Sequence, residues 1–361
     1  MFNGSYNKND VTFLLKQINL SSTSVEEKEH NIQKGKSHYS EMITHEKAPK
    51  KEYTDIFYDA VKLNGEKFAY HIWLLAHKIL KDYKNSQEIV LVSLARAGTP
   101  IGVLLNKVLK HITDKKIAHY SISIIRDRGV DKNAISFILN NHKDTDIVFL
   151  DGWTGKGVIG QELKESIDII NKEKNTKISS NLYVVADISG TAYWSATYED
   201  YLLPSAVLNS TVSGLVSRTI LNSDYIGEDD FHGCIFYEDL KEFDLSQWFV
   251  NEIFNLILNK INEYQYSDFN LENKNEIKNK SIETIQLFLE KYNLNNRNFI
   301  KPGVGESTRV LLRRIPKEIW IKDLNDVSLK HIVFLAKNKK IPLHINSELS
   351  YNAIAIIDEL D

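Results

Sequence analysis

Two segments of the sequence share one order, and that order constrains the fold most. Each has an apolar run, then a glycine-containing loop, then apolar residues at helical spacing; they begin at Ile89 and Ile147. Apolar runs of this length without charges are typical of strands buried on both faces of a parallel sheet. Loops at the carboxyl ends of parallel strands converge on one crevice. The sequence therefore predicts an α/β protein in which both loops face one ligand.

The second loop, in IVFLDGWTGKG, has the composition of a phosphate-binding turn. Glycines let successive backbone N–H groups point inward, and the start of a following helix attracts an anion. The nucleotide-triphosphate P-loop pattern does not fit, because Leu150 stands where its first glycine belongs and Gly157 follows Lys156 instead of a hydroxyl. A plain surface turn remains the alternative.

The first loop, Ala95 to Pro100, is also suited to an anion, and Pro100 fits the first turn of a helix. Between the two units, HYSISIIRDRGVD alternates like a strand and ends in a charged turn that contains Arg126 and Arg128. Guanidinium groups match phosphate oxygens in geometry, so this pair could close over a pyrophosphate. A surface turn with paired charges is the simpler interpretation.

Two further segments carry polar residues in apolar surroundings. NLYVVADI is predicted to be a strand that ends in Asp187, and the segment from Tyr201 to Leu221 is apolar but rich in hydroxyls. Buried hydroxyls need partners, and a core helix could supply them from its own carbonyls. The alternative is the polar wall of a pocket.

Length and composition bound the class of protein. A chain of 361 residues favours two domains, and 42% hydrophobic with 26% charged residues is ordinary for a globular protein. Cys234 is the only cysteine, which excludes an intramolecular disulfide and fits a reducing compartment. No signal-peptide pattern and no run of 18 apolar residues is present. We therefore expect a cytoplasmic location and no membrane partner; an oligomer is possible.

The C-terminal part is basic. Residues 291–340 contain 12 Lys or Arg and 4 Asp or Glu, although the whole chain has a net charge of -3. A basic module on an acidic body suggests a polyanion as partner, and a solvated lysine-rich face is the alternative. We predict domains at 1–264 and 296–361, joined by a helical linker at 265–295.

The order of elements after residue 296, with KPGVG at its entrance, resembles the Pelota-type RNA-binding domain. This resemblance implies that the glycine turn and the following helix contact the RNA backbone. The residues concerned are Lys301, Gly303, Gly305, Arg309, Arg313 and Arg314.

The strand and loop of FLDGWTGKG resemble the diphosphosugar loop of type I phosphoribosyltransferases, although Asp151 stands where that family usually has two acids. SLARAGTPIGVLL, DDFHGCIFY and IKPGVGESTRVLLRR extend the resemblance to nearly the whole chain. It resembles the bacterial phosphoribosyltransferase/Pelota fusion family of tellurite-resistance and stress operons, some of whose members are labelled StiP. The fold implied is a phosphoribosyltransferase-like parallel sheet flanked by helices, followed by a small α/β Pelota-type domain.

The function that the resemblance implies is transfer of ribose 5-phosphate from phosphoribosyl pyrophosphate (PRPP) with Mg²⁺ to an unknown base or small acceptor. Asp151, Arg126 and Arg128 would take the catalytic roles. Substrate would be bound by Arg96, Ala97 and Gly98 at the pyrophosphate, by Thr154, Gly155, Lys156 and Gly157 at the 5-phosphate, and by Asp187, Asn209, Ser210, Ser217 and Arg218 at the acceptor.

Two other functions remain open at this point. The missing second acid favours a non-catalytic stress sensor that binds a phosphorylated nucleotide and RNA. The StiP label implies a cysteine protease, whose nucleophile would be Cys234 with His232 two residues before it. A lone cysteine is more often a small buried hydrophobic residue. No paired spacing of histidine with cysteine or acid predicts a metal site with protein ligands.

Overall fold

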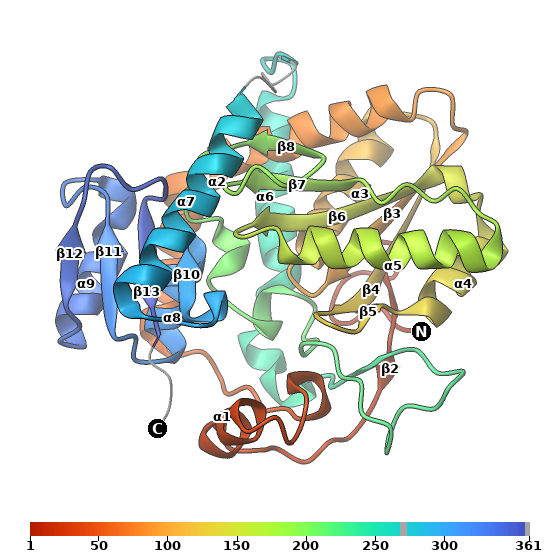
Figure 1. Cartoon of the computed structure of the whole chain (residues 1–361). Helices are drawn as coiled ribbons and strands as arrows, with labels where there is room; N and C mark the ends of the chain where they lie inside the picture. The colour runs from red at the N-terminus through yellow and green to blue at the C-terminus, as the bar shows by residue number, and fades with distance from the viewer. Residues whose placement is uncertain (268–272, 358–361) are drawn as a thin grey trace.

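A seven-stranded sheet forms the centre of the larger of two α/β units (Figure 1). The computed structural model describes residues 1–267 and 273–357. Within them the strand order is β1-β4-β3-β6-β7-β8, with β5 paired to β4, and every pair except β4 with β5 is parallel. The strands are β1 (Thr12–Leu14), β3 (Glu88–Ala95), β4 (Lys116–Ile125), β5 (Gly129–Val130), β6 (Ile147–Thr154), β7 (Leu182–Asp187) and β8 (Trp194–Thr197).

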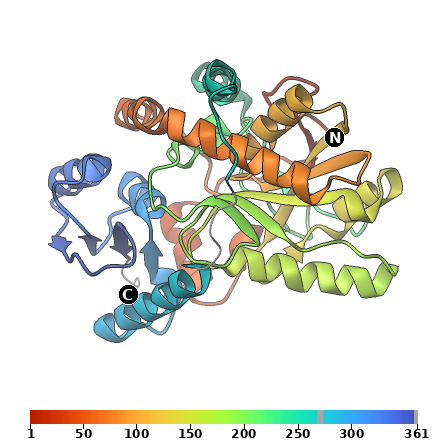
Figure 2. The ribbon, with the colours of Figure 1, turned by 90° about the horizontal axis from the view of Figure 1, so that it is seen from above.

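Helices cover both faces of this sheet, as Figure 2 shows from above. One face packs against α2 (Lys51–Asp82), α3 (Thr99–Ile112) and α6 (Ser246–Lys260). The other packs against α4 (Lys132–Asn141) and α5 (Val158–Lys174). Both faces of the central strands are therefore buried, which explains their uninterrupted apolar sequence. The predicted α/β class, with a parallel sheet flanked by helices, is confirmed.

The strand β6 is longer than its sequence indicates. The sequence suggested a strand that ends at Asp151, but Trp153 and Thr154 pair with Ala186 and Asp187 of β7. The glycine turn is correspondingly short and leads directly into α5 at Val158.

The smaller unit is a second α/β layer structure formed by the C-terminal part of the chain. Its sheet has the order β10-β13-β11-β12 and packs against α8 and α9. The elements are α7 (Lys274–Tyr292), β10 (Ile300–Pro302), α8 (Val304–Arg313), β11 (Glu318–Ile321), α9 (Lys330–Asn338), β12 (Leu343–Ile345) and β13 (Ala353–Ile356). The α7 helix, which the sequence suggested as a linker, contributes Ile285 and Phe288 to the core of this unit. The exact domain limits stay a prediction.

The hydroxyl-rich segment from Tyr201 to Leu221 is not a helix. It is buried, and it forms the short 3-10 turns η3 (Pro204–Ala206) and η4 (Ser210–Val212). Gly214 and Leu215 have positive φ angles of 82° and 59°, which a continuous α-helix does not allow. The remaining described elements of the first unit are α1 (Val25–Gln33), the 3-10 turns η1 (Tyr39–Glu41), η2 (Asp144–Asp146) and η5 (Glu238–Phe243), and the parallel pair β2 (Lys16–Gln17) and β9 (Gly233–Cys234).

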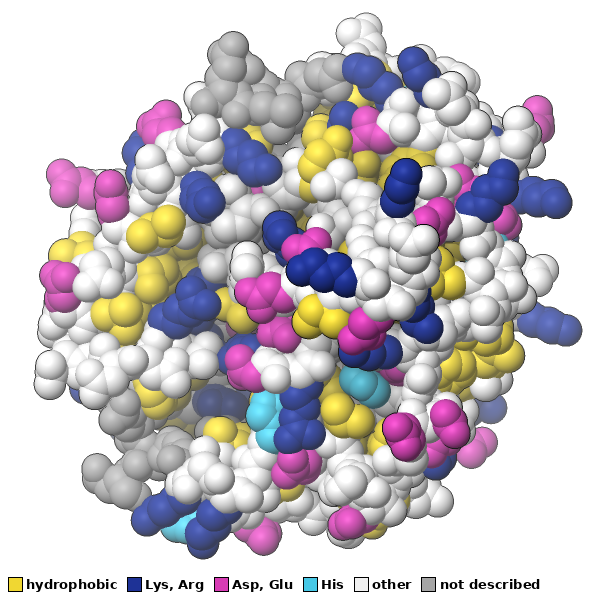
Figure 3. Space-filling model, turned by 45° about the vertical axis from the view of Figure 1, so that its right-hand side comes forward, with side chains coloured by type: hydrophobic (Ala, Val, Ile, Leu, Met, Phe, Trp, Pro, Cys, Tyr) yellow, Lys and Arg dark blue, Asp and Glu magenta, His cyan; other side chains and the backbone are white. Residues whose placement is uncertain are grey.

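Basic and acidic side chains are interspersed on the face of the molecule in Figure 3. This mixture agrees with the small net charge of -3. Of the helices in the described ranges, none combines the length and apolar character needed to cross a membrane.

Candidate functional site

A pocket of about 230 Å³ lies between the two units, at the carboxyl end of β6 and the start of α5. The lining residues of the first unit come from the end of β6, the start of α5, the first residue of β7 and the loops after β3, β4 and β6. Those of the second unit come from β10 and α8. Four basic and two acidic side chains line it: Arg126, Lys156, Lys301, Arg309, Asp151 and Glu306.

The glycine turn forms one wall of this pocket, as the sequence predicted. Thr154, Gly155, Lys156 and Gly157 all line it. Gly157 has φ 75°, and a Cβ there would lie 2.7 Å from a methyl carbon of Thr191, so both conformation and space require glycine. Within the described ranges no side chain caps the N-terminus of α5, which leaves its first N–H groups to a ligand or water.

Lys156 connects the turn to the second unit. Its ammonium donates to the carbonyl oxygens of Arg297 at 2.7 Å and Ile300 at 2.9 Å. Burial, with a contribution from the nearby cations Lys301 and Arg126, lowers the pKa of Lys156 to about 7. The amine therefore changes its charge near neutral pH.

Asp151 lies in the same pocket with few partners. Its carboxyl accepts a hydrogen bond from the N–H of Gly152 at 2.7 Å, and Arg309 exerts a weaker attraction. Burial outweighs both and raises the pKa of Asp151 to about 7. The pocket thus holds a carboxyl and an amine that both titrate near neutrality, which is common at functional sites.

The second unit closes the pocket with Glu306 and with two basic side chains, Lys301 and Arg309, that the sequence had suggested for RNA. Arg309 lies over the ring of Trp153, 5.5 Å from its centroid, and is paired with Glu306 at 3.2 Å. Burial opposes the charge of Glu306, but Arg309 and Lys301 outweigh it and lower the pKa of this carboxyl.

Of the predicted arginine pair, only Arg126 reaches the pocket. It donates to Asn298 of the second unit at 3.0 Å, and its buried Nε has no hydrogen-bond partner among the described residues. Arg128 is exposed on another face, where it pairs with Glu41 and donates to the carbonyl of Leu221. The structure therefore does not bring the two arginines over one ligand.

The first loop meets the pocket through Ala97 alone. The Arg96 guanidinium turns away to an ion pair with Glu46 at 2.6 Å and a hydrogen bond to Asn209 at 2.9 Å. Gly98 lies at the start of α3, where a Cβ would be 2.7 Å from the carbonyl oxygen of Leu150. The predicted pyrophosphate contact by Arg96 is thus replaced by an internal salt bridge.

The residues predicted for an acceptor pocket do not meet in one pocket; they form hydrogen bonds in three separate places. Asp187 is buried and accepts from the Thr154 hydroxyl and from backbone N–H groups. Asn209 accepts from Arg96, and the Ser210 N–H donates to Glu46 at 3.0 Å. These groups stabilise the loops behind the pocket and do not line it.

The last two members of that set lie elsewhere in the first unit. The Ser217 hydroxyl bonds the backbone at Arg218 and Ile235. The Arg218 guanidinium donates to the carbonyl of Met42 and lies over the ring of Tyr39. Burial lowers the pKa of Arg218 to about 10. Neither residue faces the pocket.

The sequence analysis missed two acids that organise these contacts. Glu46 forms an ion pair with Arg96 within the first unit. Asp200, also in the first unit, accepts hydrogen bonds from the N–H groups of Val304 and Asn352 of the second unit, each at 2.8 Å. Asp200 precedes the buried run Tyr201-Leu202-Leu203, and an acid at such a position is the one signal that could have identified it.

Comparison with known proteins places this arrangement in a family. Residues 4–254 match the family described as tellurite-like stress resistance cysteine protease StiP, and residues 279–359 match the PELOTA RNA binding domain. The cysteine protease StiP of Acinetobacter baylyi is 37% identical over 369 residues, covering 99% of this chain and 95% of that protein. The chain belongs to the StiP family. The predicted family is therefore confirmed.

The predicted phosphoribosyltransferase activity is wrong, because the StiP family and this relative are both named as cysteine proteases. The prediction that the chain is an enzyme is supported, because the relative is named as an enzyme; a phosphoribosyltransferase activity is not. PRPP as a substrate loses its basis with that activity, and Mg²⁺ as a cofactor stays an untested prediction.

Solved phosphoribosyltransferases do not restore that activity. A hypoxanthine phosphoribosyltransferase of Trypanosoma cruzi aligns with a TM-score of 0.28 and 12% identity over 38% of this chain and 82% of its own. A glutamine mutant from a study of an invariant aspartic acid in HPRTs aligns with a TM-score of 0.30 and 12% identity. This alignment covers 39% of this chain and 83% of that one. Likeness at this level carries no argument about the reaction.

Proposed function

We propose that this StiP-family chain is an RNA-binding enzyme whose interdomain pocket binds a phosphate-bearing ligand. The proposal rests on one observation: the start of α5, which no described side chain caps, a glycine turn and four basic side chains all meet at one pocket. The PELOTA match supports RNA as the partner of the second unit. A cytoplasmic location remains part of the proposal.

The pocket fits an anion better than a neutral ligand. Backbone N–H groups at a helix start bind phosphate, and the helix dipole adds a favourable field. Lys156 and Arg126 approach from the first unit, and Lys301 and Arg309 approach from the second. Asp151 and Lys156 would exchange protons with a bound ligand near pH 7, which is the basis for assigning the enzyme's acid–base chemistry to this pocket.

Calorimetric titration of the full chain with inorganic phosphate and with adenosine 5′-monophosphate tests the proposal. We expect both to bind. Tighter binding of the nucleotide would indicate that the pocket also contacts the group that carries the phosphate. Absence of binding by both probes at millimolar concentration at pH 6 would contradict the proposal.

The affinity for sulfate, a phosphate analogue that keeps both charges between pH 6 and 8, is expected to rise as the pH falls from 8 to 6. Lys156 gains its positive charge and Asp151 loses its negative charge over this range, since both pKa values are about 7, and both changes favour an anion. We expect a gain of about tenfold or more, since one pKa unit corresponds to ~1.4 kcal/mol. Titration in two buffers of different ionisation enthalpy measures the accompanying proton uptake. Affinity that is constant with pH, or that falls on acidification, would exclude this role for the pair.

Thiol catalysis, which the relative's name implies, would have to use Cys234 in this chain, because it is the only cysteine. Its side chain is fully buried in β9, and burial raises its pKa to about 12. The imidazole of His232 is bonded to the Ser123 hydroxyl at 2.8 Å. In the described part of the chain no hydrogen bond to the Cys234 sulfur is found. A thiol in this state is a poor nucleophile.

We therefore expect native protein to resist alkylation at Cys234. Iodoacetamide at pH 7.5 should label less than about 5% of the chain in the time that labels free cysteine completely, because the reactive species is the thiolate. Intact-mass spectrometry measures the labelled fraction, and unfolded protein is the positive control. Rapid labelling of the native chain, with a casein-hydrolysing activity that Cys234→Ser abolishes, would instead support a cysteine protease.

A further inference from the structure

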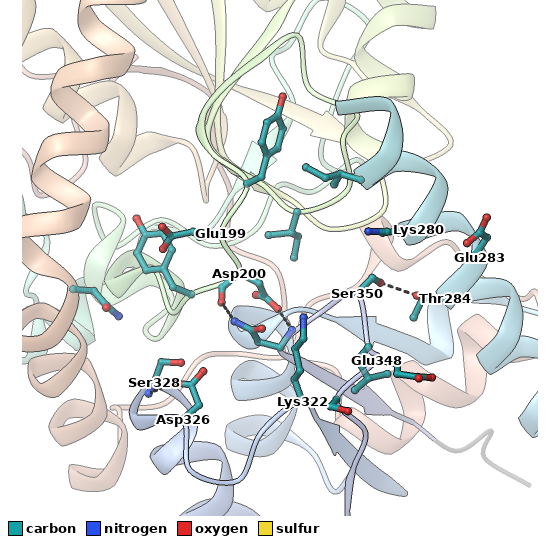
Figure 4. A pocket seen from close by; sticks show the side chains of 18 of the residues that line it. Glu199, Asp200, Lys280, Glu283, Thr284, Lys322, Asp326, Ser328, Glu348 and Ser350 are labelled. Atoms are coloured by element: carbon teal, nitrogen blue, oxygen red, sulfur yellow. Dashed lines mark hydrogen bonds between the residues drawn. The ribbon is translucent and has the colours of Figure 1, made fainter. Parts of the chain in front are cut away.

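The glycine turn of the second unit is covered by the first unit. The Asp200 carboxylate accepts from the N–H groups of Val304 and Asn352, and the Asn352 amide donates to the Asp200 carbonyl at 2.7 Å. Figure 4 shows Asp200 reaching toward the second unit at the edge of a cleft of about 840 Å³. A carboxylate of the same chain thus occupies the N-terminus of α8.

Neighbouring residues of that turn are covered as well. A Cβ at Gly303 would lie 2.5 Å from the Ile188 side chain, and one at Gly305 would lie 3.6 Å from that of Ala206. Lys301 and Arg309 face the interdomain pocket. Of the six residues predicted to contact RNA, only Arg313 and Arg314 are exposed. The glycine turn itself is therefore not open to RNA in this structure.

The segment from Val327 to Ser347 offers another surface. It contains no acidic residue and carries four lysines and two histidines. Its helix, α9, lies at the outer edge of the second unit in both ribbon views (Figures 1 and 2). Ile332, Leu335 and Ala336 anchor the buried side of this helix in the core.

The opposite side of α9 presents one stripe in which apolar and basic side chains alternate. Lys330, Phe334 and Lys337 follow each other at spacings of four and three residues, which places them on one face of α9. Val327 precedes them in the 3-10 turn η8 (Val327–Leu329), which leads into this helix. Val327 and Phe334 are each 55% exposed, and both lysines are exposed. In residues 1–267 and 273–357, no carboxylate forms an ion pair within 4 Å of either lysine.

We propose that this stripe, Val327, Lys330, Phe334 and Lys337, is the RNA-contact surface of the chain. The two lysines bind backbone phosphates, and the Phe334 ring between them stacks on an unpaired base. Single-stranded or looped RNA is recognised by this combination of cations and exposed aromatic rings. The inference depends on RNA as the partner and is independent of what fills the interdomain pocket.

Fluorescence anisotropy of the full chain with a fluorescein-labelled RNA stem that carries an internal loop tests the surface. Charge reversal with Lys330→Glu and Lys337→Glu together should weaken binding at least about tenfold and reduce the salt slope by about 2, since two phosphate contacts are lost. Phe334→Ala should weaken binding about fivefold or more and leave the salt slope unchanged. The matched control reverses Lys172 and Lys174, two exposed lysines of α5.

A further variant separates this surface from the covered glycine turn. Asp200→Ala frees the N-terminus of α8, and Glu199→Ala is its control, because Glu199 is paired with Lys67 of the first unit. The proposal expects unchanged RNA affinity in both. An affinity gain of about tenfold with Asp200→Ala alone would assign RNA to the glycine turn and overturn the proposal. Equal loss in the α9 and α5 reversal variants, or absence of RNA binding by wild type, would overturn it as well.

Discussion

Lys156→Ala is expected to weaken phosphate binding about 100-fold, because a charged hydrogen bond in a partly buried site contributes up to ~3 kcal/mol. The ammonium also holds two carbonyl oxygens of the second unit, at Arg297 and Ile300, so the same change should loosen the contact between the units. Calorimetry measures the first effect, and small-angle X-ray scattering measures the second as an increase in radius of gyration.

Lys164→Ala is the matched control for this experiment. Lys164 lies on the same helix, α5, but it is exposed and paired with Asp168. Its removal should leave phosphate binding and the shape of the chain unchanged. Wild-type phosphate affinity in Lys156→Ala would mean that the glycine turn is a structural turn and would remove the lysine from the site.

Asp187→Ala is expected to lower the free energy of unfolding by about 3 kcal/mol or more, because it leaves several buried donors without an acceptor. These donors are the Thr154 hydroxyl and the N–H groups of Ser189, Thr191 and Ala192. Urea denaturation measures the change. The loop after β7 should lose its order, and phosphate binding should weaken through the displaced Thr154.

Asp168→Ala removes the same charge from the exposed face of α5 and serves as control. It should change stability little, because exposed ion pairs contribute little. If Asp187→Ala were as stable as this control and lost only ligand affinity, then Asp187 would contact ligand directly, as the sequence suggested.

Local sequence patterns were sufficient to predict the central sheet and the glycine turn. The run from Ile147 and the glycines after Trp153 carry their information in adjacent residues, because burial on two faces and a tight turn are local requirements. The same holds for α3 and α5, whose apolar spacing is helical.

Contacts between distant segments were outside the reach of such patterns. The loop sequence around Arg96 predicts an anion ligand, but Arg96 forms an ion pair with Glu46, which lies fifty residues earlier in the chain. The sequence predicts Lys301 and Arg309 as RNA ligands, but the second unit packs so that both side chains line the interdomain pocket. The segment from Tyr201 to Leu221 is not helical as predicted, and the hydroxyls of Ser213 and Ser217 bond to backbone groups in irregular turns.

Anomalous diffraction from crystals soaked in tungstate, a heavy-atom analogue of phosphate, tests the central claim most directly. A tungsten peak is expected in the interdomain pocket, within hydrogen-bond distance of the N–H groups that begin α5 and of Lys156. The peak should be lost in Lys156→Ala. An empty pocket beside tungstate bound elsewhere on the wild-type chain would contradict the central claim.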